Sequence, residues 1–180
     1  MHRSGDKQNS SGASFFISPP SLYYLEMNAF ALVLMFLPLD QDVQQESVRL
    51  IIRKSEYTLS VFRGDSLLAK YPIAIGLNSG DKERIGDRRT PVGEFRISQI
   101  QNSASWVHDF GDGKGTMSGA YGPWFLRLKT PGWTGIGIHG THDPSSLGTM
   151  ATEGCIRLLN ESLAKLKNIV TIGTPVTIVP

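Results

Sequence analysis

Short apolar runs, separated by glycine, proline and polar residues, constrain the fold of this chain more than any other feature of its sequence. Residues 48–52 are rich in β-branched side chains, and residues 57–62 alternate between apolar and polar; both patterns predict strands. Gly64-Asp65 predicts a turn, after which residues 67–75 return as a third strand. Further strands are predicted at residues 92–97, 124–128, 136–138 and 176–179. We therefore expect a mostly β fold, either a sandwich or a partly open barrel.

One short helix is predicted to pack against this sheet. Asn160 is a favourable N-cap residue, and Leu163, Leu166 and Val170 follow at helical spacing. By contrast, residues 99–122 are rich in Ser and Gly and only weakly periodic. Because loops of this length are usually functional or mobile, we interpret this stretch either as a lid over a substrate groove or as a plain surface loop.

The length of the chain, 180 residues, leaves room for one domain and an N-terminal extension. We assign residues 1–46 to the extension and residues 47–180 to the folded domain. The extension contains an apolar run at residues 29–39, which is too short to cross a bilayer as a helix but fits the apolar region of a signal peptide. Translation would then start at Met1 or at Met27. The alternative is a buried or peripheral hydrophobic segment.

The formal net charge of +2 is too small to predict a nucleic-acid partner. The single cysteine, Cys155, excludes a disulfide within the chain and a zinc site built from several cysteines. His139, His142, Asp143 and Cys155 could nominally supply zinc ligands, but their spacing follows no common zinc site. We therefore expect no metal.

Cys155 and His139 are the residues with the clearest chemical potential. The histidine ends one apolar run and the cysteine begins another, so two short strands lying side by side would bring the imidazole and the thiol within reach of each other. A thiol attacks an acyl carbonyl as the thiolate, and it needs a base or a lowered pKa to do so. A neutral imidazole can act first as that base and then as an acid. This pairing predicts an acyl-transfer enzyme with a cysteine nucleophile.

The residues around Cys155 predict how its turn is built. Gly154 lets the backbone approach a substrate closely, and N–H groups around it can form an oxyanion hole. Arg157 is expected beside the nucleophile, either to bind a substrate carboxylate or to brace the loop that carries Cys155. Thr152, which we count among the candidate substrate-binding residues, either hydrogen-bonds within the turn or is a simple turn residue. The carboxylate of Glu153 should disfavour the thiolate.

The aromatic residues allow two interpretations. Tyr121, Trp124 and Trp106 could form the walls of a substrate groove, or they could be core aromatic residues. His108 and His142 are predicted to be solvated loop residues without a catalytic role.

The spacing from His139-Gly140-Thr141 to Thr152-x-Gly154-Cys155-Ile156-Arg157 resembles the L,D-transpeptidase catalytic domain, the YkuD-like family of bacterial envelope enzymes that remodel peptidoglycan. Three other segments fit the family pattern: Thr90-Pro91-Val92-Gly93-Glu94-Phe95, Tyr121-Gly122-Pro123-Trp124-Phe125 and Ile172-Gly173-Thr174-Pro175-Val176. The similarity spans roughly residues 48–179 and implies an L,D-transpeptidase-like β fold. The chain departs from the family pattern at Thr152, where serine is commoner, and at Glu153, where many members have histidine.

The resemblance also implies a mechanism. Cys155 would attack the carbonyl of the third residue of a peptidoglycan tetrapeptide stem and expel the terminal D-alanine. His139 would protonate the leaving amine, with its ring oriented by the backbone carbonyl of Gly140; Asp143 is the alternative orienting group. The thioester would then pass to an amine, either on another stem, giving a 3→3 cross-link, or elsewhere. Carbapenem-type β-lactams would acylate Cys155, and no cofactor would be required.

Two other functions remain open at this point. An enzyme of the same fold could resolve the thioester with water, as an L,D-carboxypeptidase or hydrolase. A non-catalytic peptidoglycan-binding module with a decayed site is the alternative from another class. The family further implies export to the periplasm or cell envelope of a bacterium, and we expect a monomer.

Overall fold

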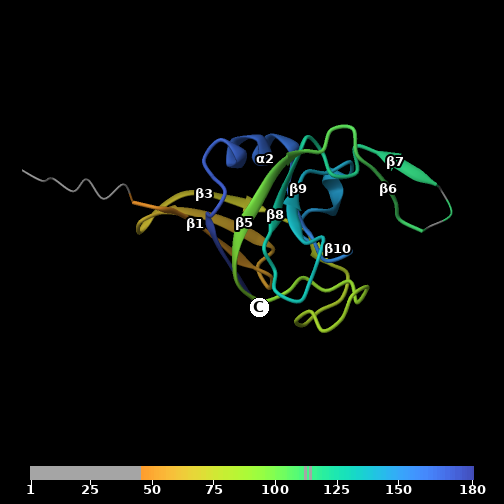
Figure 1. The fold of residues 1–180 in the computed structure, drawn as a ribbon, viewed down its shortest axis with the longest axis horizontal. Helices are drawn as coiled ribbons and strands as arrows, with labels where there is room; N and C mark the ends of the chain where they lie inside the picture. Colours follow the sequence, from red (N-terminus) through yellow and green to blue (C-terminus); the bar gives the residue numbers. More distant parts are fainter. Residues whose placement is uncertain (1–45, 112, 114) are drawn as a thin grey trace, which may run out of the picture. The chain divides into compact units, whose positions relative to one another are not determined.

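The computed structural model describes residues 46–111, 113 and 115–180 (Figure 1). The apolar run at residues 29–39 and the alternative start at Met27 lie outside the described residues. Within the described part, no helix is long and apolar enough to cross a membrane.

Eight strands form one sheet in the order β11-β9-β8-β5-β12-β1-β2-β3 (Figure 1). Neighbouring strands are antiparallel except for two parallel pairs, β1 with β12 and β9 with β11. The mostly β fold predicted from the sequence is confirmed. The strands span β1 (Val48–Arg53), β2 (Thr58–Arg63), β3 (Ser66–Pro72), β5 (Gly93–Asn102), β8 (Trp124–Leu128), β9 (Gly137–His139), β11 (Ile156–Arg157) and β12 (Pro175–Val179).

The sheet is curled, because the segment that follows β3 at one edge meets β11 at the other. Ala74 donates to and accepts from the backbone of Arg157, and both N–H···O distances are 2.9 Å. Directly after this bridge, β4 (Ile75–Gly76) pairs with β10 (Met150–Thr152). These contacts occupy backbone groups that an open edge would leave unpaired, and they make the sheet a partly open barrel.

The alternation of apolar residues along the strands places the core on one face of the central sheet. On β1, Leu50 and Ile52 are fully buried. Their partners on both neighbouring strands are buried as well: Val61 and Val176 beside Leu50, and Leu59 and Ile178 beside Ile52. The helix α2 (Asn160–Lys167) adds Leu163 and Leu166 to this core.

The predicted N-cap of this helix is wrong. Leu159 occupies the N-cap position and makes no capping hydrogen bond through its side chain. Asn160 is already inside the first turn, and its amide instead hydrogen-bonds both backbone groups of Thr141. A side-chain amide can donate and accept at once, so this two-point contact satisfies more groups than a cap would.

The prediction of one long loop at residues 99–122 is also wrong. Strand β5 continues to Asn102, because its second half pairs with β8 after a register shift between Ile97 and Gln99. Such a bulge bends a strand, which lets β5 pair with β12 on one side and with β8 on the other as the sheet curls. Beyond β5, β6 (Val107–Asp109) and β7 (Thr116–Ser118) form an antiparallel hairpin.

We expect replacement of Leu59 by alanine to lower the free energy of unfolding by about 2–5 kcal/mol, the usual effect of truncating a fully buried leucine. Leu67→Ala is the matched control, because Leu67 lies on the adjacent strand with 54% of its surface exposed whereas Leu59 has 0%. The control should change stability by no more than about 0.5 kcal/mol. Urea denaturation of both variants measures the difference, and similar losses in the two would contradict this packing.

Candidate active site

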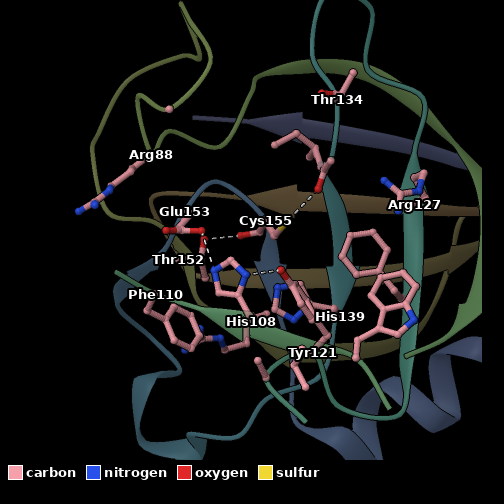
Figure 2. A pocket seen from close by; sticks show the side chains of 18 of the residues that line it. Arg88, His108, Phe110, Tyr121, Arg127, Thr134, His139, Thr152, Glu153 and Cys155 are labelled. Carbon is pink, nitrogen blue, oxygen red and sulfur yellow. Dashed lines mark hydrogen bonds and ion pairs between the residues drawn. The ribbon is translucent and has the colours of Figure 1, made fainter. Parts of the chain in front are cut away.

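A pocket of about 850 Å³ opens where the hairpin β6–β7, the loop before β5 and the ends of β8, β9 and β11 come together (Figure 2). Cys155 and His139 both line it, as do Tyr121, Arg157 and Thr152. Five of the side chains that the sequence singled out therefore face one cavity.

The parallel pairing of β9 with β11 brings the thiol and the imidazole to this cavity. Ile156 lies opposite Ile138 and Arg157 lies opposite His139, so Cys155 precedes β11 at the level of Gly137. Side chains alternate along a strand, which places Cys155 and His139 on the same face. The two motifs thus lie on neighbouring strands, as the sequence predicted.

The turn before Cys155 has a backbone shape that only glycine adopts readily. Gly154 has φ of +128°, and a Cβ at this position would lie 2.8 Å from the carbonyl oxygen of Arg89. The Gly154 N–H donates to Thr152 Oγ1 at 3.1 Å, and that hydroxyl donates to the Cys155 carbonyl at 2.6 Å. The N–H of Gly154 is therefore already occupied, and this residue contributes the shape of the turn. Thr152 hydrogen-bonds within the turn, as one of its two interpretations proposed.

Thr90 supports the same turn from outside, a role that the sequence analysis missed. Its fully buried hydroxyl donates to the Gly154 carbonyl at 3.0 Å and accepts from the Gly76 N–H at 2.8 Å. The Thr-Pro motif was the available signal, but nothing in the sequence tied it to residue 154.

The Cys155 thiol is uncharged at rest. Burial raises its pKa from the ordinary 9.0 to about 11, and the charge of Glu153 adds to this rise. The N–H of Gly137 and the charge of Arg127 lower it, but they do not offset the burial. The thiol donates to the carbonyl oxygen of Gly135 at a Sγ···O distance of 3.2 Å.

His139 is fixed in one tautomer and is also neutral. Its Nδ1 lies 2.7 Å from the Gly140 carbonyl oxygen. Because a carbonyl can only accept, Nδ1 carries the proton and Nε2 keeps its lone pair. Burial lowers the pKa of His139 to about 3. Asp143, the alternative orienting group, instead accepts from the backbone N–H and the hydroxyl of Ser145.

Aromatic rings hold the imidazole from two sides. The ring of Phe125 stacks on His139 at a centroid distance of 5.7 Å with an angle of 5° between the planes. Tyr121 meets the imidazole edge-on at 5.1 Å. Both packing contacts restrict rotation of the ring and exclude water from its faces.

Asn160 holds the turn after His139. Its Oδ1 accepts from the Thr141 N–H at 2.8 Å, and its Nδ2 donates to the Thr141 carbonyl at 3.0 Å. The amide lies against Gly140 and Gly122, where a Cβ on either glycine would collide with it. The turn at residues 139–141 thus depends on a side chain of α2, which the sequence analysis had assigned to capping.

The structure contradicts one of the two interpretations of Arg157, the bracing of the loop that carries Cys155; binding of a substrate carboxylate stays a prediction. Arg157 is buried beside the pocket, and its Nη1 donates to the hydroxyl of Ser146 at 2.9 Å, so it braces the turn η2 (Pro144–Ser146) and not the loop that carries Cys155. Its Nε is buried without a hydrogen-bond partner among the described residues. The guanidinium group therefore retains a donor that a ligand could satisfy.

Two assignments from the sequence need correction. Trp124 is not among the described residues that line the pocket; it begins β8 and lies against α2, where Lys167 Nζ is 4.7 Å from its ring centroid. His108 is not a solvated loop residue, because it belongs to β6, lines the pocket and hydrogen-bonds Tyr121 and Glu153. His142 is exposed, as predicted. The sequence does not predict the position of His108, because the pairing of the hairpin has no local signature in it.

The pocket carries more positive than negative charge. The cationic side chains among the described lining residues are Lys82, Arg88, Arg127 and Arg157, while Glu153 is the one carboxylate among them. No group of three His, Cys, Asp or Glu side chains within residues 46–111, 113 and 115–180 could hold a metal ion. Lys82 is paired with Asp87, and the three arginines still favour an anionic ligand beside the partly buried thiol.

We expect the rate of Cys155 alkylation by iodoacetamide to keep rising through pH 10. The raised pKa means that the thiolate fraction still increases about ten-fold per pH unit there, whereas a thiol with an ordinary pKa levels off near pH 9. Mass spectrometry of the intact protein at a series of pH values gives the rates, with a small free thiol as reference. A plateau near neutral pH would show instead a thiolate stabilised at rest.

We expect Asn160→Ala to release the Thr141 amide. Loss of the two-point contact should raise the hydrogen-exchange rate of this N–H by about ten-fold or more, the equivalent of one hydrogen bond. Asn168→Ala is the control, because Asn168 is an exposed residue at the other end of α2. Exchange measured by NMR at Thr141 distinguishes the two variants, and unchanged protection in Asn160→Ala would contradict the assigned role.

Comparison with known proteins agrees with the fold and the motifs. The family model for the YkuD L,D-transpeptidase catalytic domain matches residues 47–178. A Bacillus licheniformis protein named as a candidate L,D-transpeptidase, YkuD, is 33% identical over 132 residues, which cover 73% of this chain and 66% of that protein. Its Bacillus subtilis (strain 168) counterpart is 29% identical, covering 98% of this chain and 95% of that protein.

Solved structures share the fold at lower identity. The L,D-transpeptidase LdtMt1 in complex with imipenem is 21% identical with a TM-score of 0.56, covering 74% of this chain and 59% of that one. The chain therefore spans less than two thirds of LdtMt1 and of the B. licheniformis protein. The family match over most of the chain, together with the paired strands that carry His139 and Cys155, shows that this chain belongs to the L,D-transpeptidase catalytic domain family.

Proposed function

We propose that this chain is an L,D-transpeptidase that acts on peptidoglycan tetrapeptide stems through a thioester on Cys155. The observation that carries the proposal is the placement of Cys155 and His139 on neighbouring strands at one pocket. The hydrogen bond from His139 Nδ1 to Gly140 supports it further, because it leaves Nε2 free to take a proton.

In the first half-reaction, Nε2 of His139 accepts the thiol proton while Sγ attacks the carbonyl carbon of the third stem residue. The C–S bond forms, the C–N bond to D-alanine breaks, and the imidazolium returns its proton to the leaving amine. Because thiol and imidazole are both neutral at rest, proton transfer accompanies the attack and does not precede it. The thiol must first turn from the Gly135 carbonyl toward the imidazole.

The charges of the pocket suit a stem peptide, which carries carboxylates. Arg127 and Arg88 line the pocket, and the unpartnered Nε of Arg157 is a further donor beside Cys155. A guanidinium group binds a carboxylate through parallel hydrogen bonds. We therefore assign Arg157 and Arg127 to donor binding, with Tyr121 and Trp106 as pocket walls.

In the second half-reaction an amine attacks the thioester. The amide with the acceptor forms, giving a 3→3 cross-link when the amine belongs to another stem, and Cys155 is released. Transfer to water would instead make the protein an L,D-carboxypeptidase. LdtMt1, which shares the fold, has been solved in complex with imipenem. We expect carbapenems to acylate Cys155. We place this activity in the cell envelope of a bacterium, and mass spectrometry of the mature N-terminus tests the proposed export.

The decisive experiment incubates purified protein with a disaccharide-tetrapeptide and follows D-alanine, tripeptide and dimer by mass spectrometry. Cys155→Ala should abolish the thioester and all products, and His139→Gln should slow D-alanine release by about 10²–10⁴-fold, the usual contribution of a general acid–base group. His142→Gln is the control histidine and should change the rate by no more than about two-fold, since it is exposed and outside the pocket lining.

The products distinguish the remaining functions. Tripeptide with a 3→3 dimer indicates transpeptidation, whereas tripeptide alone indicates hydrolysis. Release of D-alanine by Cys155→Ala at the wild-type rate would overturn the assignment of the nucleophile. Absence of any product or thioester from the wild-type protein, with the substrate still bound, would favour the non-catalytic binding module.

A further inference from the structure

Glu153 is the one carboxylate among the described residues that line the pocket, and it lies two positions before the nucleophile. Its side chain is 47% exposed, so a ligand can reach it. In Figure 2, Glu153 and Arg127 lie on opposite sides of Cys155. The pocket therefore presents a negative group on one side of the reacting sulfur and a positive group on the other.

The position of this carboxylate is fixed by His108 of the hairpin and by Tyr121, which lies in the turn before β8. Burial raises the pKa of Tyr121, so its hydroxyl keeps its proton; this hydroxyl lies within hydrogen-bond distance of Nδ1 of His108, at 2.9 Å. Because an ionised carboxylate can only accept, Nε2 of His108 carries a proton and donates it to Oε2 of Glu153 at 3.0 Å. A chain of two hydrogen bonds thus orients Glu153 beside Cys155 while the carboxylate remains an acceptor.

This arrangement has opposite effects on the two half-reactions. Before acylation, the negative charge of Glu153 disfavours the thiolate that must attack. After acylation, the sulfur is bonded to carbon and bears no charge, so this repulsion is absent until the C–S bond breaks and His139 delivers a proton to the sulfur. The acceptor that arrives next is an alkyl amine, and at neutral pH such an amine is an ammonium ion. A carboxylate beside the thioester attracts that ammonium ion. The same carboxylate exerts no net charge–charge attraction on water, which is neutral.

We propose that Glu153, held by His108 and Tyr121, binds the ammonium group of the incoming acceptor and so directs the thioester toward cationic amines over water and neutral nucleophiles. This inference rests on the proposed thioester chemistry of Cys155. It assigns to the hairpin β6–β7 a role in acceptor choice, because His108 is the hairpin residue that hydrogen-bonds the carboxylate.

The chemical step balances with one proton released. The bound ammonium loses one proton to water, and the resulting amine nitrogen attacks the thioester carbonyl. The C–N bond forms and the C–S bond breaks. A second proton leaves the nitrogen and passes through Nε2 of His139 to Sγ, which restores the thiol and the neutral imidazole.

The test compares two acceptors in the full-length protein. The donor is the disaccharide-tetrapeptide, and the acceptors are Nα-acetyl-lysine amide, which is cationic, and hydroxylamine, which is neutral near pH 7.5. For each acceptor, mass spectrometry gives the ratio of transfer product to tripeptide. The variants are Glu153→Gln, which removes the charge and keeps the shape, and Glu161→Gln, which makes the same charge change on the exposed first turn of α2.

In Glu153→Gln, we expect thioester formation to become faster and the lysine-to-tripeptide ratio to fall about ten-fold, the effect of one charge-assisted contact. The hydroxylamine ratio should stay within about two-fold of the wild-type value, because a neutral nucleophile gains nothing from the carboxylate. Added salt should reduce the wild-type preference for lysine and leave the variant unaffected. Glu161→Gln should retain both wild-type ratios.

The outcomes separate this inference from the proposed function. An unchanged lysine ratio in Glu153→Gln, or an equal fall for both acceptors, overturns the inference while the thioester chemistry stands. Wild-type protein that forms the thioester but gives tripeptide alone with either acceptor also overturns it. If the wild-type protein forms no thioester, the proposed function and the inference both fail.

Discussion

The pairing of two very short parallel strands, β9 and β11, underlies the chemistry of this protein. The register sets His139 opposite Arg157 and Cys155 at the level of Gly137, so the thiol and the imidazole share a face. Strands this short cannot hold such a register alone. The bridge from Ala74 to Arg157 ties β11 to the other edge of the sheet, and β8 pairs with β9 on its far side. Closure of the curled sheet is therefore what positions the two reacting groups.

Burial shifts the pKa values of Cys155 and His139 in opposite directions, and both shifts favour the neutral form. Removal from water penalises the thiolate and the imidazolium alike, which raises the pKa of Cys155 and lowers that of His139. The resting site is thus a neutral pair, with Nδ1 of His139 held by Gly140. In a neutral pair of this kind, the thiol proton must pass to the imidazole as the sulfur attacks. Asn160, Phe125 and Tyr121 supply the rigidity that keeps the imidazole ready for that transfer.

In the reaction that we propose, the charged side chains around the sulfur act in different half-reactions. Arg127 and Arg157 would bind the carboxylates of a donor stem, and Glu153 would bind the ammonium group of an acceptor. The same carboxylate hinders the first step, because it opposes the thiolate. Such a residue makes physical sense in a transferase, where the choice of the second substrate matters as much as the rate of the first step. Hydrogen bonds link Glu153 to His108 and His108 to Tyr121. Through His108, the proposed choice of acceptor therefore depends on the hairpin as well.

The sequence by itself determined most strands of the main sheet, the helix at residues 160–167 and the proposed pairing of Cys155 with His139, because alternation, glycine turns and the motif residues are local signals. It placed Cys155 and His139 at the ends of adjoining runs, and the structure pairs those runs. Only the tertiary structure decided the roles of Asn160, Thr90 and His108, whose partners lie 19, 64 and 45 residues away along the chain. It also shows that Trp124 lies outside the pocket lining and that Glu153 is oriented by a hydrogen bond from His108. Hydrogen bonds between distant segments depend on how the sheet curls, and no local pattern encodes that curvature.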